Sequence, residues 1–302
     1  MFFIASRLHD TPRIAALRGV KMESLFLGLT AALVWGLHDF TVRRVSSVAD
    51  AAALYLLVLG FGVLWILPFA LATPGWAELT TGLIAFTALA GLIYALGVYA
   101  LYRAFAIGPV RLVAPICGAY PLLSVGLAMA QGQEITALVW LAALAVVAGV
   151  GLVARGEGAG SDGPSRAAIL WAMAAATGFF ASLGMLHSAA EQAADLPVAL
   201  IARIAGFAGI LALVMVQRVP VRPALPVWPT LAMMAALDLG GMFAVTAAGS
   251  FARPEFASVT SSCFGLVTVL LAWRFLAEPV RPVQWAGIAT VFAGVAVLSS
   301  QG

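Results

Sequence analysis

Charge is what this sequence has least of. Only 10% of its 302 residues are charged, whereas 63% are hydrophobic, and soluble domains carry about a quarter of charged residues. With a mean hydropathy of +1.05, this excludes a soluble domain and indicates a polytopic membrane protein in contact with the lipid bilayer. The pI of about 9.2 does not indicate a nucleic-acid partner, because Lys21 is the single lysine and the arginines are spread among loops, where they orient the spans.

Cysteine and catalytic motifs are equally scarce. The two cysteines, Cys117 and Cys263, lie in apolar segments, where a thiol behaves as a small hydrophobe and not as part of a disulfide framework or a metal site. The sequence has no HExxH zinc helix, no P-loop and no GxSxG nucleophile elbow. We therefore expect no enzyme activity, no cofactor and no metal. Any transport would be secondary and driven by a solute or ion gradient.

Ten apolar runs are long enough to cross a bilayer, which takes about 20 residues. They cover 24–44, 51–72, 79–104, 109–130, 136–154, 166–189, 197–217, 227–249, 255–276 and 283–299. The connections between them are too short to hold a soluble domain. The longest polar stretch, RGEGAGSDGPSR at 155–166, lies at the midpoint and has the composition of a flexible linker.

The two halves of the chain are related by an internal repeat. A constant shift of 145 residues superposes 108–153 on 253–298 without a gap. The superposed identities are Pro109 on Pro254, Trp140 on Trp285, Ala148 on Ala293, Gly149 on Gly294 and Val150 on Val295. Because each repeat holds an odd number of spans, the second enters the membrane from the opposite side, as in many secondary transporters.

These patterns predict an all-α membrane protein whose ten transmembrane helices form two inverted five-helix repeats. The predicted divisions are an N-terminal extension at 1–22, a first repeat at 23–154, a linker at 155–165 and a second repeat at 166–302. The extension is basic. It is open to three interpretations: a short amphipathic helix at the membrane surface, a disordered segment, or sequence upstream of a translation start at Met22.

Two motifs add a resemblance to a known family. LTAALVWG (29–36) and APICGAYPLLSVGLA (114–128), with the repeated hairpin pattern, resemble the drug/metabolite transporter superfamily, EamA type, over residues 24–299. The resemblance implies an exporter or exchanger of small metabolites, amino acids or drugs. It also implies a central cavity lined by the first, third and fourth helices of one repeat and by the sixth, eighth and ninth of the chain.

Two acidic residues interrupt these apolar runs. Asp39 lies in the last third of the run at 24–44, and Asp238 lies near the middle of the run at 227–249. A carboxylate at mid-membrane costs about 2.5–3.5 kcal/mol on insertion scales, so it is usually interior and functional. Both are candidates for binding a solute or a proton. The alternatives are that Arg43, one turn later, neutralises Asp39, and that Asp238 is a buried structural hydrogen-bonding group.

Histidine, tyrosine and arginine side chains supply further candidates. His38 and its rough counterpart His187 are candidate proton carriers, since imidazole changes charge between pH 5 and 8, or else they hydrogen-bond neighbouring helices. The remaining candidates on the third and fourth runs are Tyr94, Tyr99, Arg103 and Tyr120. They could bind a planar or zwitterionic solute, with Arg103 taking its carboxylate. Alternatively, Tyr102 and Arg103 belong to an aromatic belt with a snorkelling arginine.

Hydroxyls and one more arginine complete the candidates. Ser258 and Ser261 in SVTSSCFG either bind solute or bond back to their own helix. Arg203 is expected to snorkel to the interface, or to pair with Glu191 or Asp195 in the preceding loop.

We therefore predict a secondary active transporter of a small polar metabolite such as an amino acid. It would export or exchange the solute by alternating access in a bacterial inner membrane, with proton coupling as an option. The alternatives are a non-transporting receptor or assembly protein, multidrug cation efflux, and a membrane-embedded enzyme. Loop arginines favour termini outside, whereas the resemblance favours termini in the cytoplasm. The sequence leaves a homodimer open.

Overall fold

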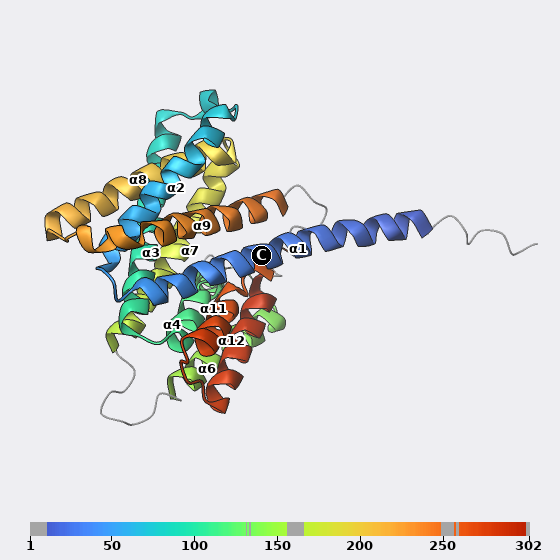
Figure 1. Cartoon of the computed structure of the whole chain (residues 1–302). Coiled ribbons are helices and arrows are strands. Elements are labelled where there is room, and N and C mark those ends of the chain that lie inside the picture. The colour runs from blue at the N-terminus through green and yellow to red at the C-terminus, as the bar shows by residue number, and fades with distance from the viewer. Residues whose placement is uncertain are drawn as a thin grey trace, which may run out of the picture.

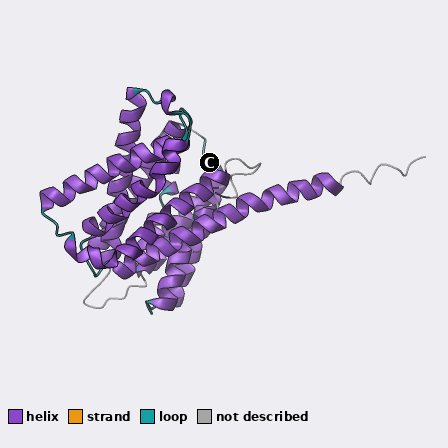
Figure 2. Cartoon of the chain, turned by 45° about the horizontal axis from the view of Figure 1, so that its top comes forward, coloured by secondary structure: helices purple, strands orange, loops and turns teal. Residues whose placement is uncertain are grey.

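The structure is a computed structural model. It describes residues 11–130, 132, 134–155, 166–248, 257 and 260–299, which are helical apart from short connections (Figures 1 and 2). The first half contains α1 (Thr11–Val45), α2 (Ala51–Ala72), η1 (Trp76–Glu78), α3 (Thr81–Ile107), α4 (Val110–Gly118), α5 (Pro121–Ala130) and α6 (Ala137–Arg155). The second half contains α7 (Arg166–Ala190), α8 (Asp195–Gln217), η2 (Arg222–Val227), α9 (Trp228–Ala248), α11 (Phe264–Phe275) and α12 (Pro282–Ser299).

The predicted all-helical membrane fold is confirmed for the described residues, but the count of ten spans is not. Seven helical segments of the described chain are both long and apolar enough to cross a membrane. In three other expected spans, the described apolar helices are shorter than 18 residues: Ala137–Val153, Phe264–Phe275 and Pro282–Leu298.

The fourth apolar run is a broken helix. Helix α4 ends at Gly118 and α5 begins at Pro121. Proline has no N–H to donate and disfavours helical geometry in the residue before it, which explains a break at this point. The ninth run is interrupted at the related place, by a turn at 262–263 before α11.

The helices of the two halves pack in matching pairs. Helix α1 packs against α9 and α11, and in the other half α7 packs against α3 and α4. Likewise α2 packs against α9, and α8 against α3. Three further pairs join helices at equivalent positions of the two halves: α2 with α8, α4 with α11, and α6 with α12. In Figure 1, α2 and α8 lie above α1, and α6, α11 and α12 lie below it.

Small residues allow these helices to approach closely, as is common in membrane bundles. A Cβ on Gly178 of α7 would lie 2.7 Å from the Cα of Gly97 on α3. Between α6 and α12, a Cβ on Gly149 would lie 2.7 Å from the backbone oxygen of Gly287. Glycine is therefore required at the centre of both contacts.

The chain from Thr11 to Met22 continues α1 as helix, and Figure 2 shows this end of α1 running out from the rest of the molecule. The first ten residues of the predicted extension lie outside the described residues. The apolar span itself is Glu23–Val45.

Candidate functional site

A cavity of about 140 Å³ lies where helices of both halves meet. Its polar lining comes from α1, α8 and α9 and consists of His38, Asp39, Arg203 and Asp238. Its aromatic lining consists of Trp35, Tyr55, Tyr94, Tyr120, Phe179 and Phe264. Tyr120 lies at the break between α4 and α5, and Phe264 begins α11. The two interrupted runs therefore both reach the cavity.

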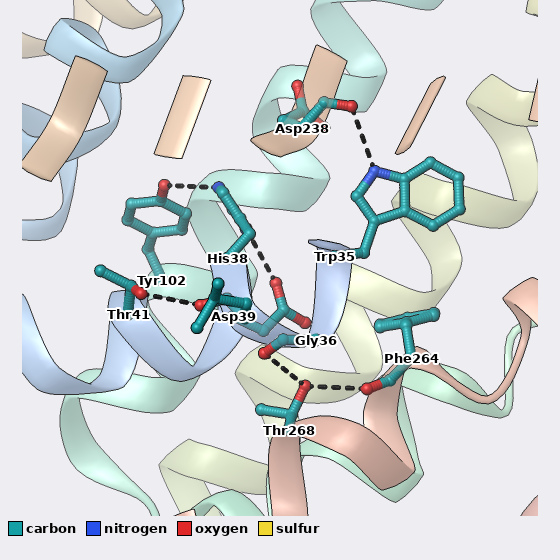
Figure 3. A network of polar contacts seen from close by, with 10 residues as sticks. Trp35, Gly36, His38, Asp39, Thr41, Tyr102, Asp238, Phe264 and Thr268 are labelled. Atoms are coloured by element: carbon teal, nitrogen blue, oxygen red, sulfur yellow. Dashed lines mark hydrogen bonds and ion pairs between the residues drawn. The ribbon is translucent and has the colours of Figure 1, made fainter. Parts of the chain in front are cut away.

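An ion pair crosses one side of the cavity. Arg203 on α8 donates to a carboxylate oxygen of Asp238 on α9 over 2.6 Å, and α2 packs against both helices. The indole N–H of Trp35 donates to the backbone oxygen of Asp238 over 3.2 Å (Figure 3). The expectation that Arg203 snorkels to the interface is therefore wrong. In a low-dielectric interior, a carboxylate on a neighbouring helix stabilises the guanidinium better than a distant interface does.

A second polar group joins α1 to α3. His38 Nδ1 lies 3.0 Å from Asp39 Oδ1, and His38 Nε2 lies 3.3 Å from the hydroxyl of Tyr102 (Figure 3). All three side chains are buried, and the ring of Tyr102 also contacts that of Tyr55 in a tilted arrangement, with centroids 5.1 Å apart. Tyr102 is therefore not part of an interfacial belt: it orients His38 from behind the cavity wall.

Arg43 does not neutralise Asp39. Its Nε donates to Glu278 Oε1 over 2.8 Å, and its guanidinium also donates to the backbone oxygen of Phe105 over 2.9 Å. Glu278 Oε2 in turn accepts the backbone N–H of Val110 over 2.9 Å. These bonds tie together the ends of α1 and α3, the start of α4 and the α11–α12 connection. The pairing of Arg43 with Asp39 that the sequence allowed is therefore wrong.

The aromatic residues form two groups around the cavity. Tyr94 and Tyr120 both contact the ring of Phe179, with centroids 5.8 Å and 6.4 Å apart. Trp35 meets Phe264 edge to face at 6.3 Å. Aromatic pairs at these distances gain about 0.5–1.5 kcal/mol beyond burial, so the walls are held in place before any ligand binds.

The structure brings together five of the ten predicted site residues: His38, Asp39, Tyr94, Tyr120 and Asp238.

Four of the other five do not line this cavity. Arg103 pairs with Asp50 at 3.4 Å and lies over Trp171, which Tyr99 also contacts edge to face. His187 is exposed and lies 3.5 Å from Glu191. Ser261 is buried but lies outside the lining, and Ser258 is outside the described residues.

Several cavity residues were missed from the sequence, and two carried a usable signal. Trp35 precedes Asp39 by four residues and so shares its helix face. Arg203 lies two turns inside an apolar run, where an ionisable residue indicates an interior partner. Tyr55, Phe179 and Phe264 are aromatic residues in apolar helices, and nothing local distinguishes them from lipid-facing ones.

Comparison with known proteins identifies the family. The sequence profile of the EamA-like transporter family matches residues 22–155 and again 166–300. The chain belongs to the EamA-like transporter family. The predicted resemblance is thereby confirmed, and the two matches give this EamA-like protein two family repeats. The family is one of transporters, which supports the expectation that the protein is not an enzyme and that its partners are a small solute and membrane lipid.

One solved structure, titled only as the crystal structure of a protein, resembles this EamA-like chain with a TM-score of 0.57 and 19% sequence identity. The match covers 91% of this chain and 95% of the other, and at this identity it shows the fold alone. No curated protein matches the sequence.

Proposed function

We propose that this EamA-like protein is a secondary transporter that carries a small polar solute across a bacterial inner membrane by alternating access. The observation that carries the proposal is the cavity between the two halves. In a chain with so few charges, three charged side chains and a histidine line this one space. Intramembrane ionisable residues that face a cavity are typical of substrate and ion pathways.

The matching helix pairs support inverted repeats at 23–154 and 166–302, and with them ten spans. Exchanging α1, α2, α3, α4 and α6 for α7, α8, α9, α11 and α12 converts each interhelical pair described above into another observed pair. This is the relation expected of a two-fold axis in the membrane plane, around which one repeat rocks against the other.

The two ends of the bundle also differ as alternating access requires. At one end, Arg43 and Glu278 join four chain segments by hydrogen bonds. At the other end Glu134, which occupies the corresponding loop position in the first repeat, is exposed. Leu183, on the α7 turn leading to that end, is a partly exposed wall of the cavity. We infer that the structure is closed at the Arg43 end.

Counterflow into proteoliposomes tests this function. The purified protein is first screened for thermal stabilisation by amino acids, organic acids, nucleosides and organic cations, since a ligand that binds only the folded state raises its stability. Each stabilising solute is then loaded into vesicles, and uptake of its labelled form is measured. The expected result is uptake above protein-free vesicles that falls in Asp238→Asn. Binding without uptake of any solute would instead favour a receptor.

A further inference from the structure

The protonation of His38 follows from its hydrogen bonds. A carboxylate can only accept, so His38 Nδ1 must carry the hydrogen that points to Asp39. Tyr102 is 1% exposed, and in the described part of the chain its hydroxyl bonds only to His38 Nε2. If Nε2 also carried a hydrogen, the buried tyrosine hydroxyl would have no acceptor, which is unfavourable. The neutral imidazole satisfies all three groups.

A neutral His38 leaves the cavity with a net negative charge. Arg203 and Asp238 compensate each other at 2.6 Å. Asp39 is 5% exposed, and within the described ranges its carboxylate bonds only to His38. A buried carboxylate without a compensating cation is costly. One positive charge would therefore neutralise this site.

The walls around Asp39 suit an organic cation better than a hydrated metal ion. Six aromatic side chains line the cavity, and aromatic faces attract ammonium groups, most strongly when these are desolvated. Resting on the proposed function, we propose that the transported solute is a small organic cation. Its ammonium group would bind Asp39 against the aromatic wall, and Tyr102 would act as a positioning residue that keeps His38 neutral.

A set of three probes with similar shapes isolates the charge. Choline, its neutral isostere 3,3-dimethylbutan-1-ol and the anion 3,3-dimethylbutanoate share a bulky head group and differ in charge. Calorimetric titration of the detergent-solubilised full chain should show that choline binds at least about tenfold more tightly than the alcohol, with no binding of the anion. Preference for the alcohol or the anion, or no binding of choline, would overturn the cation assignment.

Two isosteric variants localise the effect. Asp39→Asn should reduce the preference for choline to within about twofold of the alcohol, because the charge is removed. Asp50→Asn makes the same chemical change outside the cavity, where Asp50 faces Arg103, and should bind choline as wild type does. If Asp39→Asn fails to fold, Asp39→Glu restores the charge and should retain the preference. Unchanged choline binding in Asp39→Asn, or loss of the preference in Asp39→Glu, would contradict the proposal.

Tyr102→Phe tests the positioning role. Without the hydroxyl, His38 Nε2 loses its buried hydrogen-bond partner, so the imidazole is no longer held against the Asp39 carboxylate. The preference for choline over the neutral alcohol should fall about threefold in the variant, while the affinity for the alcohol stays the same. An unchanged preference would show that Tyr102 is only structural.

These measurements separate the cation site from transport. Choline that binds through Asp39 but does not cross vesicle membranes would support the site and contradict the transporter. Counterflow of a neutral or anionic solute through the same cavity would support the transporter and contradict the cation site.

Discussion

The helix pairs α1–α9 and α7–α3 hold equivalent places in the two halves but carry different chemistry. On α1 and α9 the cavity wall presents Asp39 and Asp238, and a Cβ on Gly241 of α9 would meet the indole of Trp35. On α7 and α3 the wall presents Tyr94 and Phe179, beside the close glycine contact at the centre of the pair. The repeat therefore preserves helix packing, while the side chains around the cavity differ.

This difference makes the cavity lining asymmetric. Charge lies on α1, α8 and α9, whereas α3 and α7 contribute aromatic and apolar side chains alone. This arrangement fits the organic cation proposed above, which has a charged group and apolar groups.

The largest effect should come from breaking the charged wall. Arg203→Met or Asp238→Leu leaves one largely buried charge without its partner, since the two side chains are 13% and 19% exposed. Either change should lower the free energy of unfolding by up to about 3 kcal/mol. The double variant removes both charges and should recover most of that loss. Unfolding in detergent measures the cycle. Additive losses in the double variant would mean that the two side chains do not interact.

The packing of α7 against α3 should be destabilised most easily at its glycine contact. Gly178→Ala introduces a methyl group against the backbone of Gly97 and should cost about 2 kcal/mol. Gly184→Ala, two turns later on α7, is the control, because a Cβ there meets nothing within 4 Å. If the two variants unfold alike, α3 and α7 do not approach closely.

Glu278→Gln should make the closed end at Arg43 open more readily. Removing this charge weakens the bonds to Arg43 and to the N–H of Val110 by about 1 kcal/mol, which is a shift of about fivefold toward an open end. In a Val98→Cys background, which places a thiol in the cavity wall, labelling by an impermeant maleimide that reaches only the Arg43 end of the protein in vesicles should speed up accordingly. Glu134→Gln changes the corresponding exposed residue and should leave the rate unchanged. Equal labelling rates in the two variants would show that Arg43 and Glu278 do not control access at this end.

The smallest effect is expected at the Arg103–Asp50 pair. Both side chains are about one-third exposed, and exposed pairs contribute about 0.2–1 kcal/mol. Asp50 also accepts the N–H of Ala52 at the start of α2, and asparagine retains that cap. Asp50→Asn should therefore change thermal unfolding in detergent by less than about 1 kcal/mol. A larger loss would assign the pair a structural role.

Local sequence predicted the helices well and their partners poorly. The run at 51–72 coincides with α2, because hydropathy acts on neighbouring residues. The run at 109–130 was expected as one span, and the structure breaks it between Gly118 and Pro121. The partners of Arg203 and Arg43 lie 35 and 235 residues away, and only the packing of distant helices decides them. The acidic residues of the cavity could be found from the sequence, because charged residues are rare in membrane spans. Most aromatic residues of the cavity could not, because aromatic residues are also common on lipid-facing surfaces.

Choline counterflow in proteoliposomes tests the account most directly. The account predicts that vesicles loaded with choline accumulate labelled choline when they contain the wild-type protein or Asp50→Asn, and that accumulation is lost with Asp39→Asn. Uptake equal to that of protein-free vesicles, or uptake that survives Asp39→Asn, would contradict it.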